Sequence, residues 1–263
     1  MLAFVIFLLC LAICPAEEAA KTDFLRVKEE GGNLCLQTAI TTYQKEEQRV
    51  TLIGAVHLAD QDYYVGLNKR FKNYDCILFE MIGGEKAAEA QESSKPAVGI
   101  AKMYQVLATF LKLAVQREVI DYSAKNFVHA DLTSEEFKKL QDEKGETLLD
   151  FGKKESGKSD PKFQKLMDAL LTGDANKVKL QLIGDLGKGD DQLDAFAGKS
   201  VIIHDRNAKA LQVLKTAVEK GNRNIGIFYG AAHFPDLEKT LVERGFKKGE
   251  QKWLNAWTVQ RTQ

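Results

Sequence analysis

Two histidines that close the same short pattern, Gly-Ala-x-His, are the residues best placed for chemistry. His57 ends the apolar run Val50 to His57, and His233 ends the run Asn224 to His233. An apolar run rich in β-branched and aromatic residues and bounded by glycine is typical of a buried strand. Ligands of open α/β sheets bind beyond the carboxyl ends of such strands. The repeated pattern predicts two imidazoles at one shared site, each turned toward the crevice by the tight backbone turn that its glycine permits.

A carboxylate and a guanidinium accompany the two histidines. Glu80 closes the apolar run Tyr74 to Ile82, which should be a third strand, and Arg206 stands beside Asn207 at an expected helix start. A charged carboxylate at the end of a buried strand is costly unless it is paired or bound to a metal. Two histidines and a carboxylate are a usual ligand set for a catalytic divalent cation, and an arginine can bind a substrate carboxylate or stabilise an oxyanion. The alternative is that the histidines are hydrogen-bonded turn residues and Glu80 a salt-bridged strand end.

The other two histidines are weaker candidates. His129 lies just before Thr133 to Glu136, a capping-box pattern that predicts the start of a helix. It is a candidate third base or ligand in the same crevice, or else a residue that caps the helix region. His204 lies two residues before Arg206, and we expect it in a supporting or surface position.

Helical patterns follow both Gly-Ala-x-His runs. The first extends from about Asp60 to Phe71 and the second from about Pro235 to Arg244, with Gly245 as its C-terminal stop. Asn207 or Asp205 is expected to cap a further helix, which runs to about residue 220. The same unit of strand and helix therefore occurs twice, with an additional helix between the two copies.

Further strands should complete the sheet. Asn33 to Tyr43 is expected to form a hairpin with the first Gly-Ala-x-His strand, and Trp253 to Val259 should lie antiparallel at an edge. Residues 83–198 are rich in Lys, Asp and Gly, and their apolar content is too broken for a second core. We expect them to form a helical insertion over the sheet, with Ile100 to Gln116 as its clearest helix and short strands at 119–122 and 127–128. The predicted fold is α/β: one domain over residues 17–263, with a mixed central sheet built from two βα units.

The N-terminal residues, Met1 to Ala16, predict a signal peptide that is cleaved after Ala16 and directs the chain to the periplasm or outside the cell. Their apolar stretch is too short to form a stable transmembrane anchor. A lipid anchor on Cys14 is the alternative. Cleavage leaves Cys35 and Cys76, both in apolar strand-like runs where buried thiols are common, although two cysteines in an exported protein can also pair.

Charge argues against a nucleic-acid partner. The chain has 37 Lys and Arg residues and 37 Asp and Glu residues, so its formal net charge is zero. Nucleic-acid binders are usually basic. A peptide or protein is the expected substrate or ligand.

Taken in order, His57 in Gly-Ala-Val-His, Glu80, Arg206-Asn207 and His233 in Gly-Ala-Ala-His resemble the motifs of the TraB/Tiki/GumN family, which has two such histidine motifs with a glutamate and an arginine. Tiki members are metal-dependent proteases that act outside the cell. The resemblance implies the wider fold of erythromycin esterases and ChaN-like haem-binding proteins. It also implies a divalent metal (Mn, Co or Zn) on His57, Glu80 and His233.

The expected function is that of an exported metal-dependent hydrolase of peptide or amide bonds, with Glu80, Arg206 and His129 as candidate catalytic residues. One alternative is a TraB-like protein that binds a peptide or haem, or inhibits, without catalysis. The other is a metal-free esterase in which His and Glu act directly as base and acid.

Overall fold

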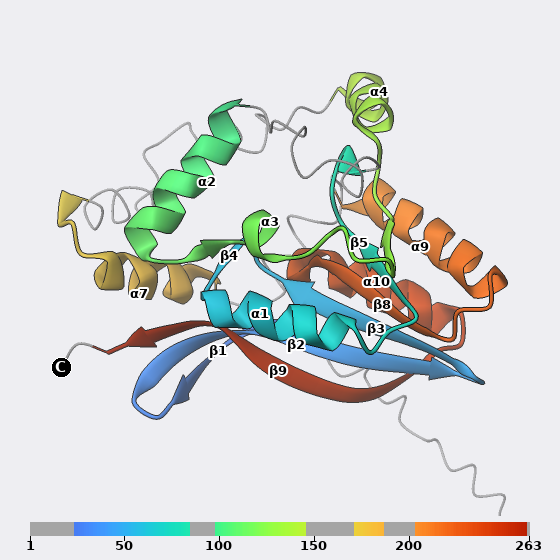
Figure 1. Cartoon of the computed structure of the whole chain (residues 1–263), viewed down its shortest axis with the longest axis horizontal. Coiled ribbons are helices and arrows are strands. Elements are labelled where there is room, and N and C mark those ends of the chain that lie inside the picture. The colour runs from blue at the N-terminus through green and yellow to red at the C-terminus, as the bar shows by residue number, and fades with distance from the viewer. Residues whose placement is uncertain (1–23, 85–97, 146–170, 187–202, 262–263) are drawn as a thin grey trace, which may run out of the picture.

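The computed structural model describes residues 24–84, 98–145, 171–186 and 203–261 of the chain. The expected signal peptide and the expected Cys14 anchor lie outside these residues. The described part is an α/β protein with a mixed seven-stranded sheet, as the sequence predicts (Figure 1). Its strands are β1 (Leu25–Glu30), β2 (Asn33–Lys45), β3 (Gln48–Ala55), β5 (Cys76–Phe79), β7 (Phe127–His129), β8 (Asn224–Gly230) and β9 (Lys247–Gln260). A separate two-stranded ladder joins β4 (Leu58–Ala59) to β6 (Ala114–Val115).

One half of the sheet is antiparallel. The expected hairpin is confirmed, since β2 pairs antiparallel with β3, with Tyr43 opposite Val50. The long strand β9 pairs antiparallel with the other side of β2, and β1 pairs with the first half of β2. The other half is parallel: β8 lies between β3 and β5, and β7 follows β5. The segment predicted as a helical insertion therefore also supplies β7, a strand of the main sheet.

The helices are α1 (Gln61–Phe71), α2 (Val98–Leu111), α3 (Gln116–Val119), α4 (Ser134–Lys144), α7 (Ala175–Leu186), α9 (His204–Glu219) and α10 (Phe234–Glu243), with a short 3-10 turn η2 (Ala231–His233) before α10. Helix α4 begins with the predicted capping box on Thr133. Helix α2 ends earlier than expected, at Leu111, and residues 119–122 do not form the expected strand.

Helices cover both faces of the parallel half. Phe71 of α1 packs edge-on against the rings of Phe228 and Phe127, with ring centroids no more than 5.3 Å apart in each pair. Phe234 of α10 lies over Gly54 on β3, whose partner on β8 is Tyr229. Because neighbouring residues of a strand point to opposite faces, α1 and α10 lie on opposite sides of the sheet. Helix α9 packs against β5 and β8.

The two remaining cysteines are core residues. Cys35 and Cys76 are both buried, and neither forms a disulfide in the described structure. Burial raises the pKa of the Cys76 thiol to about 11. The structure thus confirms the expectation that both thiols pack in strands.

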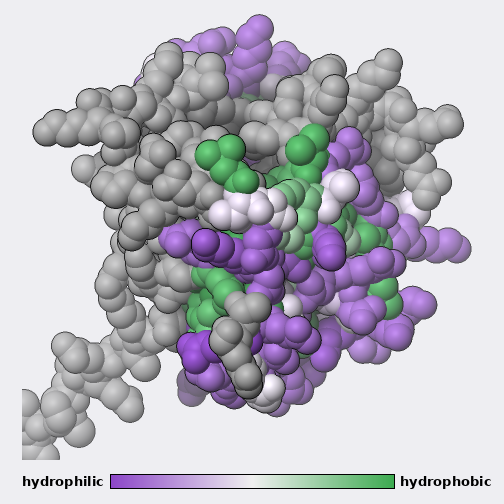
Figure 2. All heavy atoms as spheres, turned by 90° about the vertical axis from the view of Figure 1, so that its left-hand side faces the viewer, coloured by the Kyte–Doolittle hydropathy of each residue, from purple (hydrophilic) through white to green (hydrophobic). Residues whose placement is uncertain are grey.

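The surface beside α7 and the ends of β1 and β9 shows hydrophobic residues in small groups between hydrophilic ones, as far as described atoms cover it (Figure 2). Within the described ranges, no helix has the length and apolar character needed to cross a bilayer.

Candidate active site

The three predicted ligands lie at the same edge of the parallel sheet. Strands β3, β8 and β5 run in the same direction, and Ala55, which ends β3, pairs with Gly230, which ends β8. Glu80 directly follows β5, and its backbone N–H donates to the carbonyl of Phe228 at 3.1 Å. His57 and His233 follow β3 and β8 by two and three residues. The prediction that two repeated units deliver their histidines to one sheet edge is confirmed in position.

The carboxylate of Glu80 is the centre of this edge. Its Oε1 accepts a hydrogen bond from Nη2 of Arg206 at 2.6 Å, and its Oε2 accepts one from the backbone N–H of Gly230 at 2.6 Å. Nε2 of His233 lies 3.6 Å from Oε1. The side chain is only 11% exposed, so both oxygens are held in fixed directions inside the protein.

Arg206 forms a bidentate pair with Asp131, a residue that the sequence did not single out. Nε of Arg206 donates to Oδ1 of Asp131 at 2.9 Å, and Nη2 donates to Oδ2 at 2.6 Å. The Asp131 carboxylate is fully buried, two residues after the end of β7. The guanidinium thus bridges two carboxylates that follow neighbouring parallel strands.

This cluster carries an excess negative charge. Glu80, Asp131 and Arg206 contribute two formal negative charges and one positive charge within hydrogen-bonding distance. Burial alone would raise the pKa of the Glu80 carboxyl, but Arg206, His233 and His57 outweigh burial and hold this pKa well below its usual range. Although burial opposes the charged guanidinium, Glu80 and Asp131 raise the pKa of Arg206. A buried net charge favours a further cation, which is either a protonated imidazole or a metal ion.

Asn207 fixes the orientation of His233. The amide nitrogen of Asn207 donates to the backbone carbonyl of His233 at 3.0 Å and to the carboxylate of Asp236 at 2.8 Å. Its amide oxygen must therefore be the atom that lies 2.7 Å from Nδ1 of His233. An oxygen there accepts a hydrogen bond from a protonated Nδ1, which leaves the lone pair of Nε2 facing Glu80 in the neutral imidazole. Outer hydrogen bonds of this kind orient metal-binding histidines.

The first turn of α9 supplies both Arg206 and Asn207. The helix begins at His204, after Ile203, and no side chain caps it. The expectation that Asn207 or Asp205 caps this helix is therefore wrong. Asn207 is fully buried inside the first turn, where its amide bonds to His233 rather than to its own helix.

His57 differs from His233 in its surroundings. His233 is 4% exposed, whereas His57 is an exposed residue in the bend between β3 and β4. Its backbone carbonyl accepts a hydrogen bond from the N–H of Gln116 at 3.0 Å. His57 is thus placed by the end of β3, at the same sheet edge as Glu80.

The contacts described for the other two histidines are with residues other than Glu80. Nε2 of His129 lies 2.7 Å from the carbonyl of Met81, and its ring packs against Phe79. His204 is 71% exposed at the start of α9, and its Nδ1 lies 4.0 Å from the carboxylate of Asp236. His129 is thus tied to the backbone after β5, and His204 lies at the surface, as expected.

The two pattern glycines do not act as turn residues. Gly230 has φ −54°, and Gly54 lies inside β3 without a positive φ. A Cβ on Gly54 would lie 3.0 Å from the carbonyl oxygen of Ala39, and a Cβ on Gly230 would lie 3.4 Å from Oε2 of Glu80. The predicted tight turn is wrong. At Gly54 the missing Cβ permits close approach of the neighbouring strand, whereas at Gly230 the Glu80 carboxylate would lie at an ordinary contact distance from a Cβ.

The imidazole nitrogen and carboxylate oxygen atoms at this edge are suitable ligands for a divalent cation, but their arrangement meets its needs only in part. Nε2 of His233 is kept available by Asn207 and faces Oε1 of Glu80. His57 is the other imidazole that the sequence predicts as a ligand, and it follows β3 at the same edge. Arg206 already contacts the same carboxylate oxygen. Among the residues that the structure describes, no group of three or more His, Cys, Asp or Glu side chains stands in metal-binding geometry. A cation held by His233, Glu80 and His57 thus requires the exposed His57 side chain to turn toward the other two.

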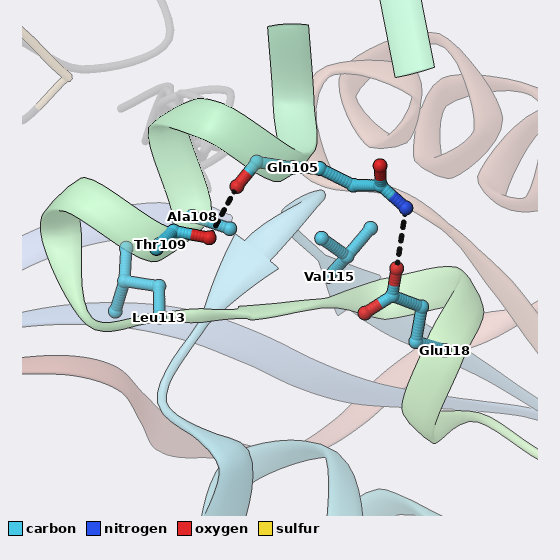
Figure 3. Close-up of a pocket in the computed structure, with 6 residues that line it drawn as sticks. All are labelled: Gln105, Ala108, Thr109, Leu113, Val115 and Glu118. Carbon is cyan, nitrogen blue, oxygen red and sulfur yellow. Dashed lines mark hydrogen bonds between the residues drawn. The ribbon is translucent and has the colours of Figure 1, made fainter. Parts of the chain in front are cut away.

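Two hollows lie near this edge. One, of about 360 Å³, is formed by α2, β6 and α3, and Figure 3 shows Val115 beside the hydrogen bond from Gln105 to Glu118 in it. The other, of about 380 Å³, is a groove between α4 and α9 that includes Leu132 and Asp205. Val115 of β6 pairs with Leu58 of β4, the residue after His57. The first hollow therefore lies next to the His57 segment.

Comparisons with protein-family models, with curated proteins and with solved structures each give no match to this chain.

Proposed function

We propose that the chain is a hydrolase of amide or peptide bonds related to the TraB/Tiki/GumN family, in which His57, Glu80 and His233 hold a divalent cation. The observation that carries the proposal is the pair formed by His233 and Glu80, whose Nε2 and Oε1 face each other at 3.6 Å. Two electron-rich atoms at this distance repel unless a proton or a cation lies near both. The excess negative charge of the cluster favours the same outcome.

Each residue has a distinct part in this proposal. A bound divalent cation would supply a Lewis acid that acidifies water and polarises a carbonyl. Asn207 holds the imidazole of His233 in the binding tautomer, and Arg206 holds Glu80 ionised and in place. His129 supports the segment after β5 through Met81. In this account the fold is of the erythromycin esterase and ChaN type, with substrate bound beyond the carboxyl ends of β3, β8 and β5.

A specific observation favours a second candidate, the metal-free hydrolase. The guanidinium of Arg206 already lies 2.6 Å from Oε1 of Glu80, where it supplies a positive charge without a metal. Protonated His233 would then pair with Glu80, and the two would act as acid and base. A third candidate, a non-catalytic peptide or haem binder, uses the same crevice without turnover.

Metal content and turnover separate these candidates. Purified protein is stripped with a chelator, reloaded with Mn, Co or Zn, and tested on a randomised set of internally quenched peptides. We expect one metal per chain and cleavage that the chelator abolishes. Cleavage that survives complete removal of metal would establish the metal-free candidate, and absence of cleavage with every metal would leave the binding candidate.

The histidine variants test whether one ion is shared. His57→Ala and His233→Gln should each abolish stoichiometric metal binding, and the double variant should lose no more than either single variant, because ligands of one ion act as a unit. His204→Ala is the matched control, since His204 is exposed at the same end of the molecule and is 71% accessible. Independent, mild and additive losses would show two structural histidines.

Export is part of the same proposal. The apolar leader Met1 to Ala16 supports a mature chain that begins near Glu17 outside the cytoplasm. Intact-mass measurement of the chain from its native host should show loss of the first sixteen residues. Retention of Met1, or a lipid on Cys14, would contradict it.

A further inference from the structure

His57 and Gln116 stand opposite each other at the end of the small β4–β6 ladder. Leu58 of β4 pairs with Val115 of β6. In this antiparallel register the next two residues along the ladder are His57 and Gln116, and the backbone N–H of Gln116 donates to the carbonyl of His57 at 3.0 Å. Opposite residues of an antiparallel pair project their side chains to the same face, with Cβ atoms roughly 4.5–5.5 Å apart. The amide of Gln116 is therefore a cross-strand neighbour of the His57 imidazole.

The side chain of Gln116 points to the side of the ladder on which Glu80 lies. Its neighbour Val115 lines the hollow under α2 (Figure 3), and successive residues of a strand point to opposite faces. Nε2 of Gln116 donates to the hydroxyl of Tyr122 at 2.9 Å. The ring of Tyr122 lies 5.2 Å from that of Phe79, the residue directly before Glu80. Gln116 is thus directed away from the hollow and toward the end of β5.

One end of the Gln116 amide lacks a hydrogen-bond partner. Oε1 is buried and accepts no hydrogen bond from any residue in the described ranges, and the residue as a whole is 8% exposed. A buried acceptor without a donor costs free energy comparable to a lost hydrogen bond, so such an atom calls for an explanation. Because the bond from Nε2 to Tyr122 holds the amide in place, the missing donor must come to Oε1.

Asn207 shows what an amide oxygen does in the second Gly-Ala-x-His unit. Its nitrogen is engaged by the backbone carbonyl of His233, and its oxygen lies 2.7 Å from Nδ1 of the same residue. An imidazole that binds a metal through one ring nitrogen carries its proton on the other, and an oxygen usually accepts that N–H. His57 closes the first unit and needs the same kind of acceptor when it acts as a ligand. Oε1 of Gln116 is an amide oxygen of this kind on the opposite strand.

We propose that Oε1 of Gln116 accepts the ring N–H of His57 when this imidazole turns toward Glu80 to bind a cation. Gln116 would then be a positioning residue for His57, as Asn207 is for His233. The turn of the ring fills the buried acceptor, so the hydrogen bond contributes to metal affinity and is absent from the metal-free protein. The inference rests on the proposed function, because it concerns His57 as a metal ligand.

Metal affinity tests the proposal without turnover. The full chain is stripped with a chelator and titrated with Zn²⁺ by calorimetry. Gln116→Met, which keeps the size of the side chain but has no oxygen, should bind Zn²⁺ about 10–100-fold more weakly. Gln116→Glu keeps one oxygen for His57 and one for the Tyr122 hydroxyl, so it should bind far more tightly than Gln116→Met. Gln105→Met, which changes an exposed glutamine in the adjacent hollow, is the matched control and should bind as the wild type does.

A structural role of Gln116 makes a different prediction. Gln116→Met loses the bond to Tyr122 but also removes an unfilled buried acceptor, so the melting temperature of the metal-free variant should stay close to that of the wild type. If Gln116→Glu bound Zn²⁺ as weakly as Gln116→Met, the oxygen would not be the group that matters, and the inference would be overturned.

NMR of the histidine rings observes the hydrogen bond itself. In Zn²⁺-loaded protein with ¹⁵N-labelled histidine, the ring N–H of His57 should give a signal protected from exchange with water. Gln116→Met should lose this protection, whereas the ring N–H of His233 should keep it. Unchanged protection of His57 in Gln116→Met, with unchanged affinity, would overturn the inference and leave the proposed function standing. A wild-type chain that binds no Zn²⁺, Mn²⁺ or Co²⁺ would reject both.

Discussion

The amide oxygen of Asn207 lies 2.7 Å from Nδ1 of His233, and this contact determines which imidazole nitrogen faces Glu80. It joins the first turn of α9 to the end of the second Gly-Ala-x-His unit. Both partners are buried, at 0% and 4% exposure, so the orientation is fixed by the packed interior rather than by solvent. The basic nitrogen of the site therefore depends on a residue that does not itself face Glu80.

Replacing Asn207 should weaken metal binding without removing a ligand. Asn207→Leu deletes the acceptor for Nδ1, and we expect metal affinity to fall roughly 10–100-fold, as for other residues that orient a metal-binding histidine. Asn207→Asp keeps an oxygen at that position and should retain more of the affinity. Calorimetric titration of the reloaded protein measures both, with Asn176→Leu on α7 as a distant control. Wild-type affinity in Asn207→Leu would show that the contact serves stability alone.

Acid should destabilise the protein through Glu80. Burial opposes ionisation, but Arg206 and His233 hold the pKa of the folded Glu80 carboxyl well below its usual range. The unfolded chain takes up this proton near pH 4.3, roughly the ordinary pKa of glutamate, while the folded chain does not. The stabilising contribution is thus complete above that pH, and it is lost as the pH falls toward the folded pKa.

Urea unfolding of wild type and Glu80→Gln at several pH values between about 6 and 3 measures this effect. The unfolding free energy of the wild type should fall with decreasing pH more steeply than that of the variant. Equal slopes would mean that other carboxylates cause the acid sensitivity.

Arg206 should be a large contributor to stability. Its removal leaves the carboxylates of Glu80 and Asp131 buried and facing the same space, and breaking a buried ion pair in this way costs about 3–5 kcal/mol. Arg206→Met should therefore lose about that much unfolding free energy, whereas Arg70→Met on the exposed side of α1 should change little. Adding Asp131→Asn to Arg206→Met should recover part of the loss, because it removes one of the two unpaired charges. If the double variant lost the sum of the unfolding free energies lost by the two single variants, the three residues would not form one charge cluster.

Much of the sheet could be predicted because its signals are local. The hairpin of Asn33 to Tyr43 with the first Gly-Ala-x-His strand is seen as β2 and β3. The second unit is seen as β8 and α10, ending near Gly245 with φ +85°. Apolar runs, caps and a stop glycine act over a few residues, so they can be read from one sequence. The lengths of β2 and β9 were underestimated, since pairing with each other extends both beyond their apolar parts.

The site could be predicted only where a residue type was unusual for its place. Glu80 at the end of an apolar run and the two repeated histidines were visible in this way. Asp131 was not, because nothing around it in the chain indicates that it is fully buried against Arg206, 75 residues away.

The two pattern glycines should respond differently to alanine, although they occupy equivalent positions in the repeat. At Gly54 a Cβ would lie 3.0 Å from the backbone carbonyl of Ala39, which its own strand ladder holds in place, and 3.4 Å from Phe234. Gly54→Ala should therefore cost about 1–3 kcal/mol of unfolding free energy, the range for overpacking a core. At Gly230 the nearest atoms would be Oε2 of Glu80 at 3.4 Å and Cδ2 of His233 at 3.8 Å, which are ordinary contacts. Its φ of −54° suits alanine, so Gly230→Ala should be neutral or stabilise by roughly 0.4–1 kcal/mol through the unfolded chain. Denaturant unfolding of both variants measures the difference. Equal losses at the two positions would show that both glycines are needed for backbone conformation, as the sequence pattern alone had indicated.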